Sequence, residues 1–191
     1  MTQPPVDKMV VVVHGTFASK ALWWRWPSPF TQYLDSLSGG TVYKGTDFFT
    51  WRARDYDKDR RAGAKDLAAW VQMHPARDLT IVAHSHGGNV VMIATRHGVK
   101  MNRLILLGTP IRTDYTPDLR NVDVLHNVYS FGDLTQTPTG TAPHCRGEGR
   151  TLGDSAKVIN HLAQNGFIGP GHTELHDVNV WTANHFDQLV S

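Results

Sequence analysis

The chain has 191 residues, of which 40% are hydrophobic and 19% charged, and its formal net charge is +2. This length suits one compact domain and is short for two, so we expect a single domain over residues 1–191. The small charge and scattered basic residues give no reason to expect a nucleic-acid partner, and the single cysteine, Cys145, excludes an internal disulfide.

The first half of the chain predicts two strands and two helices. Residues 8–13 form a β-branched run without helical period, which is typical of a strand buried on both faces of a sheet. Residues 29–37 predict a helix that ends before two glycines, and residues 46–51 predict a second, aromatic strand. Residues 57–73 carry apolar side chains at near-helical spacing and stop before Pro75, which predicts an amphipathic helix.

The second half of the chain continues this alternation. The expected strands are residues 79–83, 103–107, 124–131 and 156–162, and the expected helices are residues 87–97 and 178–190. Residues 135–153 are rich in Gly, Pro and Thr and predict a long loop. Strands that alternate with helices predict βαβ units, and therefore an α/β fold whose mostly parallel sheet carries helices on both faces.

One stretch, IVAHSHGGNVV at residues 81–91, places a serine where a predicted strand meets a predicted helix. A serine on such a sharp turn needs small residues two positions before and two after it, and Ala83 and Gly87 meet this need. The turn would present the Ser85 hydroxyl above the carboxyl edge of the sheet, with the backbone N–H of His86 facing the same space. The pattern therefore predicts that Ser85 is a nucleophile.

Two other interpretations of this stretch stay open. His84 and His86 form a His-x-His pair of the kind that binds metal ions, but a zinc site needs a third protein ligand and the turn would point the two imidazoles apart. Alternatively, the stretch is only a polar turn that enters a helix. We favour the nucleophile and expect no metal ligand.

A serine nucleophile needs a base to take its proton and a third group to orient that base. Asp133 follows the predicted strand 124–131 and would lie at the same sheet edge, although an Asp in a simple turn fits the same pattern. The base should come later in the chain, where His172 follows Gly-Pro-Gly. His176 and His185 compete for this role, and His185 falls inside the predicted last helix.

The segment His14-Gly15-Thr16 supplies a second loop at the same edge, because it follows the first predicted strand. A backbone N–H of Thr16 or Phe17 would pair with that of His86 around a developing oxyanion. A simple tight turn would use the same residue types.

Together these segments resemble the α/β-hydrolase superfamily, in particular its small bacterial lipase-like and esterase-like serine hydrolases. The resemblance rests on HGT, on AHSHGG with Ala in place of the first Gly, on FGD and on GHTEL, in the family order Ser, Asp, His. It implies ester hydrolysis through an acyl-enzyme intermediate without a metal or organic cofactor. The catalytic residues that it implies are Ser85, His172 and Asp133, and the oxyanion-hole amides are those of Thr16 or Phe17 and of His86.

Two further features bear on the substrate. Little sequence separates residues 107 and 124, so no substantial cap domain fits there. Trp23, Trp24 and Trp26 crowd the loop after the first strand, where they could bind substrate or touch lipid, or else pack between the first strand and the first helix.

We therefore expect a carboxylester hydrolase that acts on a small-molecule or lipid ester, with contact to a membrane surface as one option and no protein partner implied. The alternatives are a thioesterase, amidase or acyltransferase with the same triad, or a non-catalytic binding protein with the same fold. The polar N-terminus lacks the apolar segment of a signal peptide, so we expect a cytoplasmic protein, although export without a cleaved signal would leave no trace in the sequence.

Overall fold

The computed structural model describes residues 4–136 and 148–190, and in them five parallel strands form one sheet in the order β1-β2-β3-β4-β5. The strands are β1 (Val6–Val13), β2 (Ala76–His84), β3 (Met101–Leu107), β4 (Val122–Tyr129) and β5 (Val158–Leu162). The α-helices are α1 (Pro29–Leu37), α2 (Asp57–Met73), α3 (His86–Thr95) and α4 (Val178–Ala183). The short 3-10 helices are η1 (Thr113–Tyr115), η2 (Leu119–Asn121), η3 (Leu134–Gln136), η4 (His172–His176) and η5 (Phe186–Leu189).

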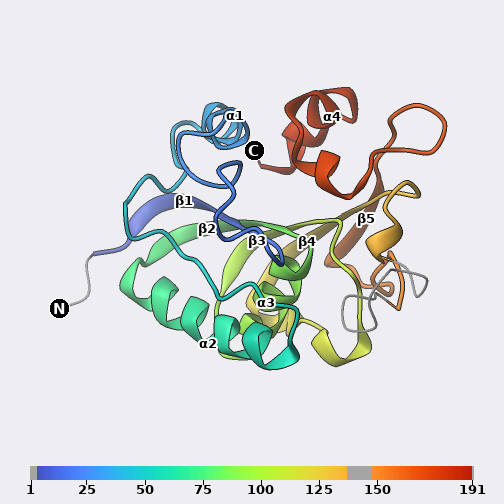
Figure 1. The fold of residues 1–191 in the computed structure, drawn as a ribbon. Coiled ribbons are helices and arrows are strands. Elements are labelled where there is room, and N and C mark those ends of the chain that lie inside the picture. The colour runs from blue at the N-terminus through green and yellow to red at the C-terminus, as the bar shows by residue number, and fades with distance from the viewer. Residues whose placement is uncertain (1–3, 137–147, 191) are drawn as a thin grey trace.

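Helices cover both faces of the sheet, with α2 and α3 on one side and α1 and α4 on the other (Figure 1). The predicted α/β fold with a parallel, doubly covered sheet is confirmed. The predicted loop over residues 135–153 lies largely outside the described residues, and so does Cys145.

The β-branched run of β1 is buried on both faces because its side chains alternate between two cores. Val11 and Val13 pack in the core that α2 completes with Leu67, while Val12 packs in the core that α1 completes with Phe30. Such two-sided burial is why a parallel strand that helices cover on both faces has no polar alternation. Each fully buried aliphatic side chain contributes roughly 1.5–3 kcal/mol to folding.

The aromatic segment 46–51, predicted as a strand, is not one. Val42 makes a single bridge to Val10, and the chain then runs without further strand pairing. Phe49 and Trp51 are each 3% exposed, and the Trp51 indole N–H donates to the His14 carbonyl at 2.9 Å. The aromatic pattern therefore reflects packing of irregular chain into the core rather than a place in the sheet.

The predicted closing helix over residues 178–190 is broken in the structure. Helix α4 ends at Ala183. The Asn184 side chain then accepts from the Gln164 N–H and donates to the Gln164 carbonyl. His185 adopts a left-handed backbone with φ of 57°, and the 3-10 helix η5 follows. The hydrogen bonds between Asn184 and the neighbouring loop explain the break in the helix. An amphipathic pattern alone could not reveal them.

The connection between β3 and β4, which lies wholly within the described residues, contributes no cap domain to the carboxyl edge of the sheet. It contains only η1 and η2, and Tyr115 of η1 packs against α2, where its hydroxyl donates to Asp57 at 2.6 Å. Among the described residues, no helix is long and apolar enough to cross a membrane.

Candidate active site

Ser85 occupies a strained turn between β2 and α3. Its backbone has φ of 55° and ψ of −136°, a conformation that residues other than glycine seldom adopt. Its N–H donates to the Leu107 carbonyl at 2.8 Å, which ties the turn to the end of β3. The predicted strand-to-helix junction at Ser85 is therefore present, with the strain that a sharp turn requires.

Three glycines let neighbouring segments close around this turn. A Cβ on Gly15 would lie 2.7 Å from Ser85 Cβ, so the loop after β1 approaches the serine directly. A Cβ on Gly87 would collide with the His14 carbonyl oxygen, and one on Gly88 with the Thr109 side chain. The sequence predicts the need for a small residue at position 87, whereas the contacts of Gly15 and Gly88 depend on tertiary structure.

His172 and Asp133 meet at the same edge, although 39 positions separate them. His172 Nδ1 lies 2.7 Å from Asp133 Oδ2, and the Asp133 side chain is fully buried while that of His172 is 22% exposed. A carboxylate can only accept, so Nδ1 carries the hydrogen and Nε2 of a neutral ring is a proton acceptor. The Thr135 N–H donates to the other carboxylate oxygen at 2.9 Å.

Gly108 permits this pairing, which sequence reasoning missed. It has φ of +59°, and a Cβ there would lie 2.7 Å from Asp133 Oδ2 and 3.2 Å from His172 Nδ1. Gly108 directly follows β3, so a glycine at a strand end was the available signal.

A second group of missed residues holds the Asp133 loop, and one of them, Ser130, also ties it to the His172 loop. The Ser130 hydroxyl donates to the Pro170 carbonyl at 2.7 Å, and Arg150 donates to the carbonyls of Ser130 at 2.9 Å and Asp133 at 3.3 Å. Isolated Ser and Arg residues carry no sequence signal for such a role, because their partners are distant in the chain.

The two competing histidines lie in other surroundings. His176 stacks on Trp23 with ring centroids 3.9 Å apart and an interplanar angle of 3°. Burial lowers the pKa of His176 to about 4. His185 is exposed at the break after α4. In the part of the chain that the structure describes, the imidazole bound to Asp133 is that of His172.

Hydrogen bonding in the loop after β1 distinguishes the two expected oxyanion donors, the backbone amides of Thr16 and Phe17. The Phe17 N–H donates to the Ala53 carbonyl at 2.7 Å, so it is already engaged, and the expectation for Phe17 needs correction. Thr16 is the remaining candidate, and its hydroxyl is buried without a hydrogen-bond partner among the described residues. His86 is the first residue of α3, beside the Ser85 turn.

The histidines that flank Ser85 bind separate partners, as expected for imidazoles that point apart. His84 Nε2 lies 2.9 Å from the His172 carbonyl oxygen, and His86 Nδ1 accepts from the Asn89 amide at 2.8 Å. Within residues 4–136 and 148–190, no group of three His, Cys, Asp or Glu side chains could hold a metal ion.

The three candidate substrate-binding tryptophans differ in position. Trp24 is 3% exposed and its indole N–H donates to the Ala18 carbonyl at 2.8 Å, which favours a packing role. Trp26 is exposed beneath the Lys44 ammonium, 4.5 Å from the ring centre. Trp23 lies beside His84 and His176, and with Phe30 it lines an open groove of about 370 Å³ next to η4.

Comparisons with known proteins bear on the fold. No protein-family model and no curated protein matches the sequence. A solved structure from Xanthomonas campestris, assigned to the α/β superfamily of hydrolases, aligns with a TM-score of 0.55 and 13% identity over 96% of this chain and 98% of that one. The solved structure of esterase PE8 aligns with a TM-score of 0.54 and 15% identity over 98% and 94%. At such identities the likeness concerns the fold.

Proposed function

Because this chain has the α/β-hydrolase fold, we propose that it is a serine hydrolase that cleaves carboxylic esters with Ser85, His172 and Asp133. The observation that carries the proposal is the 2.7 Å hydrogen bond between His172 and the buried Asp133, beside the strained Ser85 turn. The esterase and hydrolase descriptions of similar folds support the reaction class without fixing it.

In the first half of the reaction, Ser85 Oγ attacks the ester carbonyl carbon while His172 Nε2 takes the hydroxyl proton. Asp133 stabilises the imidazolium that forms. The tetrahedral intermediate then collapses: the bond between the carbonyl carbon and the alcohol oxygen breaks, and His172 gives the proton to the departing alcohol. The acyl group stays on Ser85.

In the second half, a water molecule loses a proton to His172 Nε2 and attacks the acyl carbon. The bond to Ser85 Oγ breaks, the proton returns to the serine, and the carboxylic acid leaves. Backbone amides of Thr16 and His86 would stabilise both oxyanions, because fixed donors in a water-poor site need little reorganisation. The buried Thr16 hydroxyl supplies a further donor in this loop.

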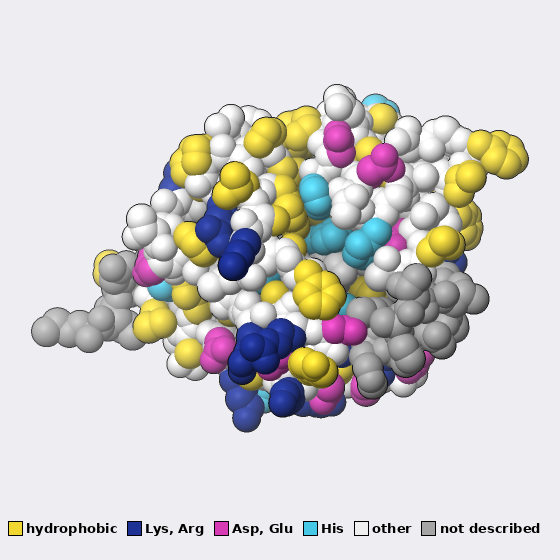
Figure 2. All heavy atoms as spheres, viewed as in Figure 1, with side chains coloured by type: hydrophobic (Ala, Val, Ile, Leu, Met, Phe, Trp, Pro, Cys, Tyr) yellow, Lys and Arg dark blue, Asp and Glu magenta, His cyan; other side chains and the backbone are white. Residues whose placement is uncertain are grey.

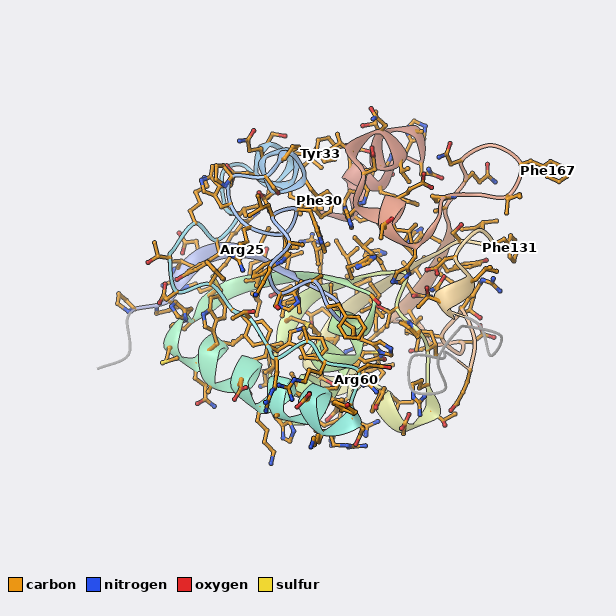
Figure 3. All side chains as sticks on the ribbon, viewed as in Figure 1. Arg25, Phe30, Tyr33, Arg60, Phe131 and Phe167 are labelled. Carbon is orange, nitrogen blue, oxygen red and sulfur yellow. The ribbon has the colours of Figure 1, made fainter. Side chains whose placement is uncertain are left out.

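An apolar rim supports an apolar or lipid ester as substrate. Its side chains follow β1, β4 and β5 at the carboxyl edge of the sheet, and they are between 59% and 105% exposed. The rim consists of Phe17, Leu22, Phe131, Leu134, Phe167 and Ile168. Phe131 and Phe167 point outward (Figure 3), and Figure 2 shows histidine side chains near the centre of this face with hydrophobic side chains on either side.

The test of the proposed function is hydrolysis of p-nitrophenyl butyrate together with labelling by a fluorophosphonate. We expect the wild type to react with both, Ser85→Ala to react with neither, and Asp133→Asn to lose about 10⁴-fold in kcat. Ser36→Ala, at an exposed position on α1, is the matched control and should behave as wild type. Full ester hydrolysis by a folded Ser85→Ala protein would refute the proposal.

A further inference from the structure

His84 directly precedes the proposed nucleophile and contacts the backbone of the proposed base. It is 5% exposed, and its Nε2 lies 2.9 Å from the carbonyl oxygen of His172. A carbonyl oxygen only accepts hydrogen bonds, so the hydrogen sits on His84 Nε2. His84 therefore donates to the main chain of the same residue whose side chain binds Asp133.

His84 is suited to hold a group in place rather than to carry protons. Burial lowers the pKa of His84 well below its usual value, and nearby His172 and His176 lower it further. The ring is thus neutral at pH 7, with a donor at Nε2 and an unprotonated Nδ1. A buried donor of fixed tautomer gives a bond of constant direction.

Aromatic packing fixes the orientation of this ring. Trp23 presents an edge-on contact at 5.4 Å between ring centroids, and His176 another at 5.2 Å. Trp23 and His176 also stack on each other. Because His172 begins η4 and His176 ends it, the His84 contacts hold both ends of η4 against the β2 turn.

We propose that His84 is a positioning residue: its Nε2–H anchors the His172 main chain so that the imidazole reaches Asp133 and Ser85 together. The bond to Asp133 fixes one ring atom and leaves the ring free to swing about it, whereas a second anchor on the backbone limits that swing. His84 and Ser85 are consecutive, so one turn of chain sets the positions of nucleophile and base. This inference rests on the proposed function.

Three substitutions of His84 separate positioning from packing. His84→Phe keeps an aromatic ring without the donor, His84→Asn keeps an amide that is too short to reach the His172 carbonyl, and His84→Gln places an amide N–H near the former Nε2. We expect kcat for p-nitrophenyl butyrate to fall about tenfold to hundredfold in the Phe and Asn variants, as for a misplaced catalytic group, with KM little changed. The Gln variant should recover most of the loss.

His74→Phe is the matched control. Like His84, His74 is hydrogen-bonded and in ring contact with a tryptophan, here Trp70, but it follows α2 at the opposite edge of the sheet. The kcat of this variant should therefore equal that of wild type. Thermal unfolding confirms that each protein is folded. Equal kcat in the folded Asn and Gln variants would overturn the positioning role of His84. A wild type that neither hydrolyses esters nor reacts with fluorophosphonate would overturn the proposed function instead.

Discussion

Gly108 offers a prediction in which backbone strain and contact with the Asp133–His172 pair can be separated. Its φ of +59° lies in the left-handed region, and a Cβ would lie 2.7 Å from Asp133 Oδ2, 2.8 Å from Leu175 Cδ1 and 3.2 Å from His172 Nδ1. Gly108→Ala therefore adds left-handed strain of about 1 kcal/mol and forces Asp133, His172 or Leu175 to move.

Gly98 provides the matched control, because it has φ of +85° and a Cβ added there would meet nothing within 4 Å. Gly98→Ala carries the strain alone, which predicts a Tm about 2–4 °C lower for a protein of this size. Overpacking in a closed interior adds roughly 1–3 kcal/mol, so Gly108→Ala should lower Tm by a further several degrees.

The effect on activity should be confined to Gly108→Ala. A displacement of the Asp133–His172 pair by several tenths of an ångström predicts a kcat about tenfold to hundredfold lower, whereas Gly98→Ala keeps the wild-type kcat. Differential scanning calorimetry and p-nitrophenyl butyrate kinetics measure the two effects on the same samples. Equal kcat and equal Tm in the two variants would refute the argument that Gly108 makes room for the pair.

Two further predictions concern the rim and His14. Changing Phe131 and Phe167 to Ser should lower the ratio of kcat/KM for an emulsified long-chain ester to kcat/KM for an acetate ester about tenfold. Met73→Ser, exposed at the far end of α2, should leave this ratio unchanged. An unaltered ratio in the Phe131 and Phe167 variant would exclude the rim from substrate binding. Burial lowers the pKa of His14 to about 4, so protonation of this ring favours the unfolded state. The stability that His14 contributes is therefore present above pH 6.5 and is lost as the pH falls from 6.5 to 4. Measured by urea unfolding, the free energy of unfolding of the wild type should fall about 3 kcal/mol more than that of His14→Gln between pH 6.5 and 4. Parallel plots of this free energy against pH would contradict the lowered pKa of His14.

Much of the fold follows from local sequence because its elements carry complete signals. The boundaries of α1 and α2 are those predicted, since Ser28 and Pro29 begin α1 and the Pro75 segment ends α2. The errors fall where partners are distant. Residues 46–51 have strand-like composition but no neighbouring strand, and the helix after residue 178 breaks where Asn184 binds another loop.

The candidate site divides in the same way. Ser85 is visible in the sequence because a strand, a helix and small residues meet around it. Chain order favours Asp133 and a later histidine, and the structure pairs His172 with Asp133. The supports of Asp133 come from Ser130, Arg150 and Gly108, whose contacts span loops far apart in the chain. Local pattern cannot encode them. Even the choice between Thr16 and Phe17 as oxyanion donor depends on a distant residue, because the Phe17 N–H donates to the carbonyl of Ala53, more than thirty positions away.

The histidines around Ser85 differ in how deeply their side chains are buried. His14, His84 and His176 have pKa values lowered mainly by burial, so they are neutral at pH 7 and act as fixed donors, acceptors and stacking surfaces. His172 differs because its side chain is partly exposed and is hydrogen-bonded to the buried carboxylate of Asp133. Of the buried rings, that of His84 lies 4.6 Å from the His172 ring between centroids and donates to the His172 carbonyl, so a neutral imidazole holds the proposed base in place.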